Sequence, residues 1–248
     1  MSVTLSTLSS RSSERAFYTT MAVCIAVVVF IGFSRTFFLR FAFPGASEYA
    51  APEPFFYVHG VFFAAWFALL VAQTSFIGSG RVRLHRRFGF AGVGLAGAMV
   101  ALGAIGALIA ARRPGGFIGL TQPPLEFLAI PIFDLLLFGV FVALAALWRR
   151  DVQAHKRLML IATINIMEAA IVRIPVSLVE NGGVLMAFWL ADVFLAALVL
   201  WDVVSLKRLH AVTLWAGVAT VVSQPLRFEI ARTDAWLAFA GWAVGLLG

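Results

Sequence analysis

Apolar runs long enough to cross a membrane follow one another along the chain, separated by short polar turns. One of them extends from Phe55 to Phe76 without a formal charge. At about 1.5 Å of rise per residue, a helix of this length spans a hydrocarbon core of roughly 30 Å. Only a helix satisfies its own backbone over such a length in lipid. The pattern therefore predicts an all-α, polytopic transmembrane bundle of seven spans plus a short C-terminal interfacial helix.

The expected organisation has three parts. A cytoplasmic tail covers residues 1–16, the seven-span bundle covers 17–225, and an outer interfacial segment covers 226–248. The last apolar run, 235–247, is too short to span and carries two Trp, which is typical of a helix at the membrane surface. Polar, Gly and Pro residues mark the turns, including an outer turn at 181–183 and a stop at 224–225. The expected spans are 17–38, 55–76, 88–111, 125–148, 158–178, 184–204 and 209–223.

Basic residues gather in three short turns, after the second, fourth and sixth spans. Short loops rich in Lys and Arg remain on the cytoplasmic side of a bacterial inner membrane. We therefore expect the amino end inside and the carboxyl end outside. These turns and anionic lipid headgroups explain the net charge of +7 better than nucleic acid does. The residues concerned are Arg81, Arg83, Arg86, Arg87, Arg149, Arg150, Lys156, Arg157, Lys207 and Arg208.

The second span carries a polar stripe. His59, Trp66 and Gln73 follow one another at seven-residue spacing, which places them on nearly the same face of a helix. His and Gln side chains are costly against hydrocarbon, so this face should lie against other helices. The stripe is either a packing seam or the wall of a ligand or cofactor pocket.

Charged side chains also occur at membrane depth, in the fourth, fifth and sixth spans. Such residues must pair or face water, and they indicate functional sites. Arg173 lies at the same expected depth as Asp134 and Asp192, so an ion pair should join the three spans. Glu168 has no cation at its own expected depth. We therefore expect Glu168 to be protonated or to face an aqueous cavity.

Three His lie at the cytoplasmic starts of spans, each beside Lys or Arg: His85, His155 and His210. Imidazole nitrogen is a ligand of haem iron and of several metal ions. These His are candidate cofactor ligands, and His85 with His155 is the preferred pair. The alternative is that they contact phospholipid headgroups.

Composition narrows the class of protein further. Of the 248 residues, 62% are hydrophobic, against about 45–50% in soluble domains, which indicates one integral membrane domain. Cys24 is the single cysteine, so an intrachain disulfide and a Cys-based metal cluster are excluded. The sequence contains no Walker A, HExxH or CxxC motif, which argues against a soluble-type catalytic centre.

Three segments, HGVFFAAWFALLVAQ, GRVRLHRRFG and HKRLMLIAT, together resemble a family of uncharacterised bacterial multi-pass membrane proteins. The resemblance covers most of the chain and implies a bacterial inner-membrane protein. It depends on His59, Gly60, Trp66, Gln73, Gly80, Arg81, His85, Arg86, Gly89, His155, Lys156, Arg157 and Met159.

A more distant likeness is to cytochrome b561-type haem membrane proteins, which also carry His on successive helices and an HG…W start to a span. That likeness implies haem b and electron transfer. Those proteins use paired His on two sides of the membrane, whereas His59 is the only His expected near the outer side here. At most one bis-His haem, at the inner side, is therefore expected.

Three functions follow as hypotheses. The first is a redox or electron-transfer protein with b-type haem on cytoplasmic-side His. The second is a small-ligand or proton-coupled transporter or sensor. The third is a structural membrane partner without a catalytic site, in a homo-oligomer or beside another membrane protein. The second would use an outer-half polar cluster that comprises His59, Gln73, Asp134, Glu168, Arg173 and Asp192.

Overall fold

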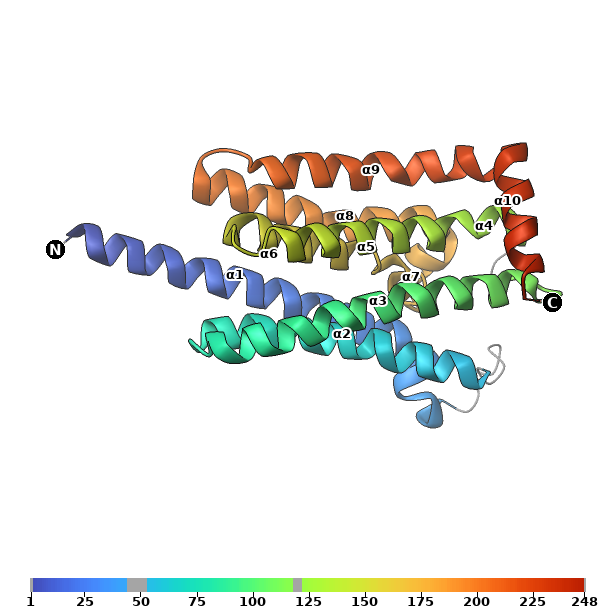
Figure 1. Cartoon of the computed structure of the whole chain (residues 1–248), viewed down its shortest axis with the longest axis horizontal. Coiled ribbons are helices and arrows are strands. Elements are labelled where there is room, and N and C mark those ends of the chain that lie inside the picture. Colours follow the sequence, from blue (N-terminus) through green and yellow to red (C-terminus); the bar gives the residue numbers. More distant parts are fainter. Residues whose placement is uncertain (1, 44–52, 118–121, 248) are drawn as a thin grey trace.

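The computed structural model describes residues 2–43, 53–117 and 122–247. Within these ranges the chain forms helices and no strand, so the all-α fold class is confirmed. The long helices run side by side along one axis (Figure 1). Length and composition alone select five membrane-spanning candidates in the described chain, which does not establish a count of seven. The candidates are Ser12–Phe38, Pro54–Gly78, Val82–Arg112, Pro124–Leu147 and Asn181–Leu206.

The chain up to Arg112 forms one long helix and a helical hairpin. The amino-terminal helix begins at Ser2, so most of the segment expected as a separate tail continues the first span. Gly32 of this helix lies against the backbone carbonyl of Ala170, where a Cβ would collide. The elements are α1 (Ser2–Phe33), the π-helical turn η1 (Ser34–Phe38), the 3₁₀ turn η2 (Arg40–Ala42), α2 (Pro54–Gly78) and α3 (Val82–Arg112).

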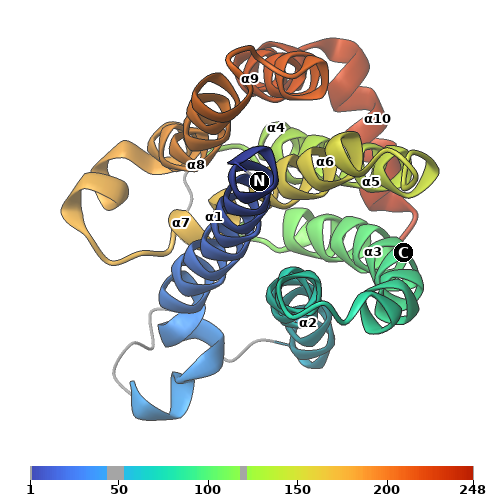
Figure 2. The ribbon, with the colours of Figure 1, turned by 90° about the vertical axis from the view of Figure 1, so that its left-hand side faces the viewer.

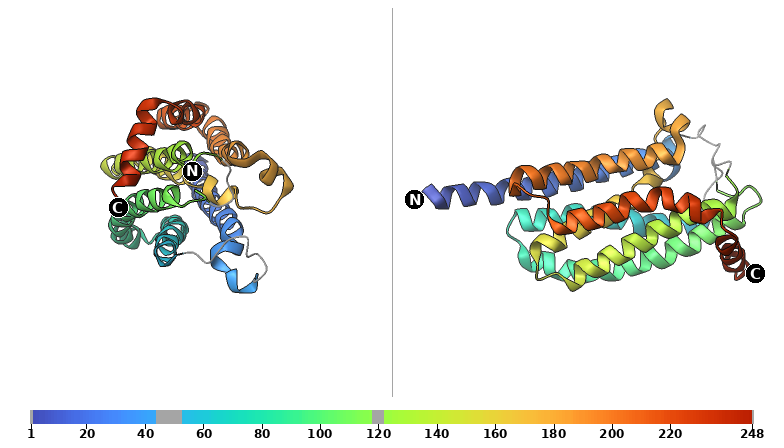
Figure 3. Two further views of the ribbon diagram at one scale, coloured as in Figure 1. Left: turned by 90° about the vertical axis from the view of Figure 1, so that its right-hand side faces the viewer. Right: turned by 90° about the horizontal axis from the view of Figure 1, so that it is seen from above.

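The remaining chain completes the bundle and closes one end of it. The last helix lies across the end of the bundle opposite the amino terminus (Figures 1 and 3). Its Trp236 donates from Nε1 to the carbonyl of Leu125 at 2.8 Å, while Trp242 is exposed. The elements are α4 (Pro124–Phe127), α5 (Ala129–Leu147), α6 (Val152–Ile164), α7 (Glu168–Ile171), α8 (Ser177–Leu206), α9 (Ala211–Ala231) and α10 (Asp234–Gly245).

The fifth expected span, 158–178, is not one continuous helix. Helix α6 ends at Ile164, and regular helix resumes only for the four residues of α7. This broken segment lies near the centre of the bundle (Figure 2), and Leu158, Ile161 and Met167 are fully buried. Non-helical backbone at membrane depth is tolerated where protein surrounds it, because other groups can then satisfy its polar atoms.

The backbone breaks at the expected outer turn but not at the expected stop. Within α8, Gly183 leaves helical geometry with φ of 56° and ψ of −144°, so a kink at the expected turn 181–183 separates two helical segments. Helix α9 continues through Pro225 to Ala231, so the stop expected at 224–225 is wrong. A Pro inside a packed membrane helix is tolerated when neighbouring groups satisfy the freed backbone. This continuation brings the first residues of the expected outer segment, 226–231, into the bundle.

Candidate functional site

One face of α9 carries polar side chains into the bundle. The opposite face exposes Leu214, Val218 and Val222, as expected for a helix that meets lipid on one side. The polar residues recur three, four or seven positions apart, which keeps them on one stripe. They are Thr213, Thr220, Ser223, Gln224 and Arg227, all buried.

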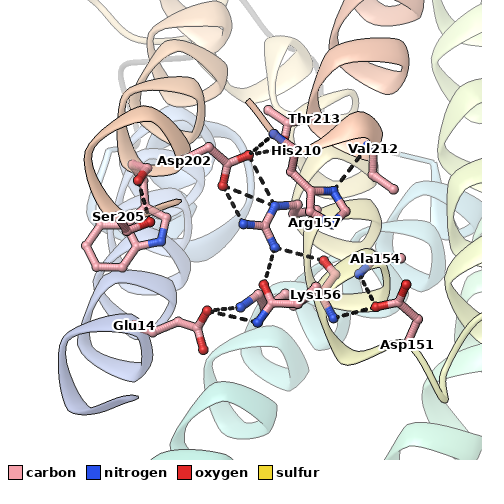
Figure 4. Close-up of polar contacts among 12 residues, drawn as sticks. Glu14, Asp151, Ala154, Lys156, Arg157, Asp202, Ser205, His210, Val212 and Thr213 are labelled. Atoms are coloured by element: carbon pink, nitrogen blue, oxygen red, sulfur yellow. Dashed lines mark hydrogen bonds and ion pairs between the residues drawn. The ribbon is translucent and has the colours of Figure 1, made fainter. Parts of the chain in front are cut away.

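At the end of the bundle where the chain begins, this stripe joins an inner ion pair between Arg157 and Asp202 (Figure 4). Arg157 Nε lies 3.1 and 3.2 Å from the two Asp202 carboxylate oxygens, and both side chains are fully buried. Thr213 Oγ1 donates to Asp202 Oδ2 at 2.5 Å, and Arg157 Nη1 donates to Gln153 Oε1 at 2.6 Å. Because every charge has partners, the inner pair fits a structural role.

A second ion pair, between Glu14 and Lys156, attaches α1 to the same region (Figure 4). Gln153 Nε2 also donates to Glu14 Oε1 at 3.3 Å. The Lys156 ammonium lies 4.9 Å from the centre of the Tyr18 ring. The amino-terminal helix is therefore held to α6 by charge, hydrogen bonding and a cation–π contact.

The three His expected on the cytoplasmic side do not form one group. His210 precedes α9, where its Nδ1 accepts a hydrogen bond from the Val212 backbone N–H at 3.2 Å. Its backbone N–H donates to Asp202 at 3.3 Å. Burial, and secondarily the Arg157 charge, lowers the pKa of His210. His210 is thus an N-cap beside the inner ion pair, and its expected role as a third cofactor ligand is not supported.

His85 and His155 do come together. Their ring centroids lie 6.3 Å apart and their planes are perpendicular, at 90°. His155 Nδ1 lies 2.8 Å from the Ala145 carbonyl oxygen. A carbonyl only accepts, so Nδ1 carries a proton, and Nε2 is the ring nitrogen that has a lone pair in the neutral imidazole. Within the described chain, His85 Nδ1 and Gln73 Oε1 are buried without hydrogen-bond partners.

An ion pair between Arg227 and Asp134 joins α9 to α5 in the other half of the bundle. Arg227 is 1% exposed and Asp134 is 5% exposed. Arg227 Nη2 also donates to Ser223 Oγ at 3.1 Å, and the guanidinium lies 5.1 Å from the Phe188 ring centre. Position 227 is seven residues from Thr220 and four from Ser223, so Arg227 continues the polar stripe of this helix. The sequence prediction missed Arg227 because it ended the last span before Pro225.

Glu168, at the start of α7, lies beside this pair. Its side chain is buried, and its carboxyl group is within hydrogen-bonding distance of the Asp134 carboxyl group. Two carboxyl groups thus lie close together, and the Arg227 guanidinium pairs with that of Asp134. Among described residues, Arg227 Nε and Asn165 Oδ1 are buried without hydrogen-bond partners.

The ion pair expected between Arg173 and the acids of neighbouring spans is wrong. Asp134 pairs with Arg227, and Asp192 accepts a hydrogen bond from Gln224 Nε2 at 3.0 Å. Arg173 instead donates to the carbonyl of Ala169, and its exposed guanidinium lies 5.0 Å from the Phe33 ring centre. The cause is the irregular chain around α7, which removes Arg173 from the depth that a continuous helix would give it.

The polar stripe of α2 faces other helices, as expected. Trp66 Nε1 donates to Thr163 Oγ1 at 3.2 Å, and its ring meets Phe138 edge-on. His59 stacks on Phe63 at 4.2 Å between centroids, and its Nδ1 lies 3.4 Å from the Leu102 carbonyl oxygen. These contacts are those of a packing seam. The contacts of His59 and Gln73 lie on α2 and α3, so the expected six-residue outer-half cluster reduces to Asp134 and Glu168 with Arg227.

Comparison of the chain with protein-family models, curated proteins and solved structures gives no match. Across the described residues, no group of three or more His, Cys, Asp or Glu is placed to hold a metal ion. Two local arrangements carry chemistry: the His85–His155 pair and the site formed by Asp134, Glu168 and Arg227.

Proposed function

We propose that the protein is a seven-pass bacterial inner-membrane protein with a cytoplasmic amino terminus. Seven passes result if α6 and α7 together count as one broken crossing and α9 counts as another. The α2–α3, α5–α6 and α8–α9 turns lie at the same end of the bundle as the amino terminus (Figure 1). All three turns are basic, which favours the cytoplasmic side. Helix α10 would then lie at the outer surface, with Trp242 toward the lipid interface.

We propose further that this membrane domain is a b-type haem electron-transfer protein, with His85 and His155 as the two iron ligands. The observation that carries the proposal is the 6.3 Å separation of the ring centroids. With about 2 Å for a metal–nitrogen bond and about 1.2 Å from nitrogen to ring centre, imidazoles on opposite sides of one metal have centroids about 6 Å apart. A tetrahedral pair would bring them to about 5 Å. The spacing therefore favours opposed ligands, as in a bis-His haem.

The surroundings of the pair are compatible with this role. The hydrogen bond from His155 to the Ala145 carbonyl fixes the ring and directs the free Nε2 away from the backbone. Gly89, one turn after His85, has few neighbours, with only Gln73 Nε2 within 4 Å of an added Cβ. Arg81 and the neighbouring basic residues can pair with carboxylates at the cytoplasmic surface. Bound haem would supply reversible one-electron chemistry.

The test is the absorbance spectrum of protein purified after expression with adequate haem supply. A Soret band is expected, lost in His85→Gln and His155→Gln and kept in His59→Gln and His210→Gln. These four variants cover every His of the chain, so the last two serve as matched controls. A wild-type protein without a Soret band, or a band that survives substitution of both proposed ligands, would refute the assignment.

A further inference from the structure

We infer that Asp134, Glu168 and Arg227 form a site that binds one exchangeable proton within the membrane domain. This site lies apart from the His pair and does not depend on haem. It assigns to the membrane domain a bound proton that two carboxyl groups share. The number of charges and of hydrogen-bond partners in the site identifies the ligand as a proton.

The hydrogen-bonding valences require one proton. Ionised carboxylates only accept hydrogen bonds, so two carboxyl groups within hydrogen-bonding distance are compatible only if one is protonated. Arg227 remains charged because a guanidinium is not deprotonated in proteins. One guanidinium, one carboxylate and one carboxylic acid sum to zero charge. Ionising both acids would leave a net negative charge buried away from water, at a large cost.

The charge pair between α5 and α9 is complete without Glu168. Asp134 alone neutralises Arg227, and an apolar side chain at position 168 would avoid the cost of a second buried acid. The second observation that points to a ligand is the unsatisfied Nε of Arg227, on a side chain only 1% exposed. A guanidinium with an unused donor beside two carboxyl groups can change its carboxylate partner.

Among the described residues of the neighbouring elements, no other cation is shown to pair with these two acids. Helix α8 places the Phe188 ring over the guanidinium, while its Asp192 is hydrogen-bonded to Gln224 of α9. The end of α6 contributes Asn165, whose amide donates to Thr220. Arg227 is therefore the one cation among the described residues shown to pair within this site.

Exchange follows from a change of partner. When the Glu168 proton passes to Asp134, the charge moves to Glu168 and the Arg227 guanidinium pairs with Glu168 instead. The O–H bond on Glu168 breaks, the O–H bond on Asp134 forms, and the net charge is unchanged. Loss of the proton to water would instead leave both acids ionised beside one cation. The site therefore holds one proton, which rests on Glu168 while Asp134 pairs with Arg227.

Infrared spectroscopy can count protonated carboxyl groups directly. The chain would be purified in a detergent without ester groups, so that lipid carbonyls do not overlap the carboxylic-acid C=O band. Wild-type protein is expected to show one buried, protonated carboxyl band at neutral pH. Glu168→Gln should remove it, and the exposed Glu229→Gln on the same α9 should leave it unchanged.

The Asp134→Asn variant distinguishes a proton that the two carboxyl groups share from a proton that Glu168 holds alone. If the proton is shared, the substitution gives Arg227 to Glu168, which ionises, and the band disappears. A band that persists in Asp134→Asn, or in Glu168→Gln, overturns the inference, as does its absence from the wild type. If Glu168→Gln fails to fold, ¹³C-glutamate labelling of the wild type must shift the band, and an unshifted band overturns the inference equally.

Discussion

Arg227 of α9 forms an ion pair with Asp134 of α5, 93 residues away along the chain, inside the apolar bundle. The pair joins two helices that each expose apolar side chains on their other faces. Because Arg227 also contacts Ser223 and the Phe188 ring, its position is fixed from three directions. A second pair, Arg157–Asp202, joins α6 to α8 at the end of the bundle where the chain begins, and Thr213 of α9 donates a hydrogen bond to it.

Removing Arg227 should destabilise the protein. Arg227→Met leaves two buried acids without a cation, and breaking a buried pair costs roughly 3–5 kcal/mol. Protonation of both acids would limit the loss to the lower part of that range. The measurement is denaturant unfolding in detergent micelles. Arg232→Met, at an exposed position just beyond α9, is the matched control and should stay within about 0.5 kcal/mol of the wild type.

The inner pair can be tested by a double-mutant cycle. Asp202→Asn leaves the fully buried Arg157 without its carboxylate, and Arg157→Gln leaves Asp202 without its guanidinium. Each single substitution should cost roughly 3–5 kcal/mol, and the double variant should cost less than the sum of the two. Additive losses would show that the two side chains are not energetically coupled. Asp151→Asn, which keeps an N-cap oxygen at an exposed site, is the control.

Stability should fall on acidification through His210. Its Nδ1 accepts the Val212 N–H, and burial lowers its pKa, so the folded state prefers neutral imidazole. The unfolded chain binds more protons than the folded one below the ordinary His pKa of about 6.5. The contribution of His210 is therefore complete above that value and is lost as pH falls from it through the lower folded-state pKa.

The measurement is the difference in unfolding midpoint between wild type and His210→Asn from pH 8 to pH 5. Asn caps a helix without titrating, so the variant should lose less stability at low pH than the wild type. Because both proteins keep the other His, their titration cancels in the comparison. Parallel pH profiles would contradict the assigned role of the imidazole.

Two glycines should respond oppositely to the same substitution. Gly32→Ala puts a methyl group into the backbone carbonyl of Ala170, which cannot rotate away, so α1 must separate from α7. A loss of about 1–3 kcal/mol is expected from such overpacking. Gly94→Ala on α3 meets nothing within 4 Å and should gain up to about 1 kcal/mol from helix propensity. Thermal unfolding of the two variants side by side provides the check.

The sequence by itself determined the properties that depend on neighbouring residues in the chain. Apolar runs predicted the helices, because lipid leaves no alternative backbone structure of that length. The seven-residue spacing of His59, Trp66 and Gln73 predicted a face that packs inward, and the structure places that face against other helices. The sequence also predicted His85 and His155 as the preferred pair of cofactor ligands; the structure brings the two rings together, and ligation stays a prediction.

Only the tertiary structure decided which charges meet. Depth estimates that assumed continuous helices matched Asp134 with Arg173, but the chain breaks after Ile164 and α9 continues past Pro225. Both departures depend on surrounding helices that satisfy the exposed backbone groups, so no local pattern reveals them. A buried carboxylate takes the cation that packing brings to it, and for Asp134 that cation is Arg227.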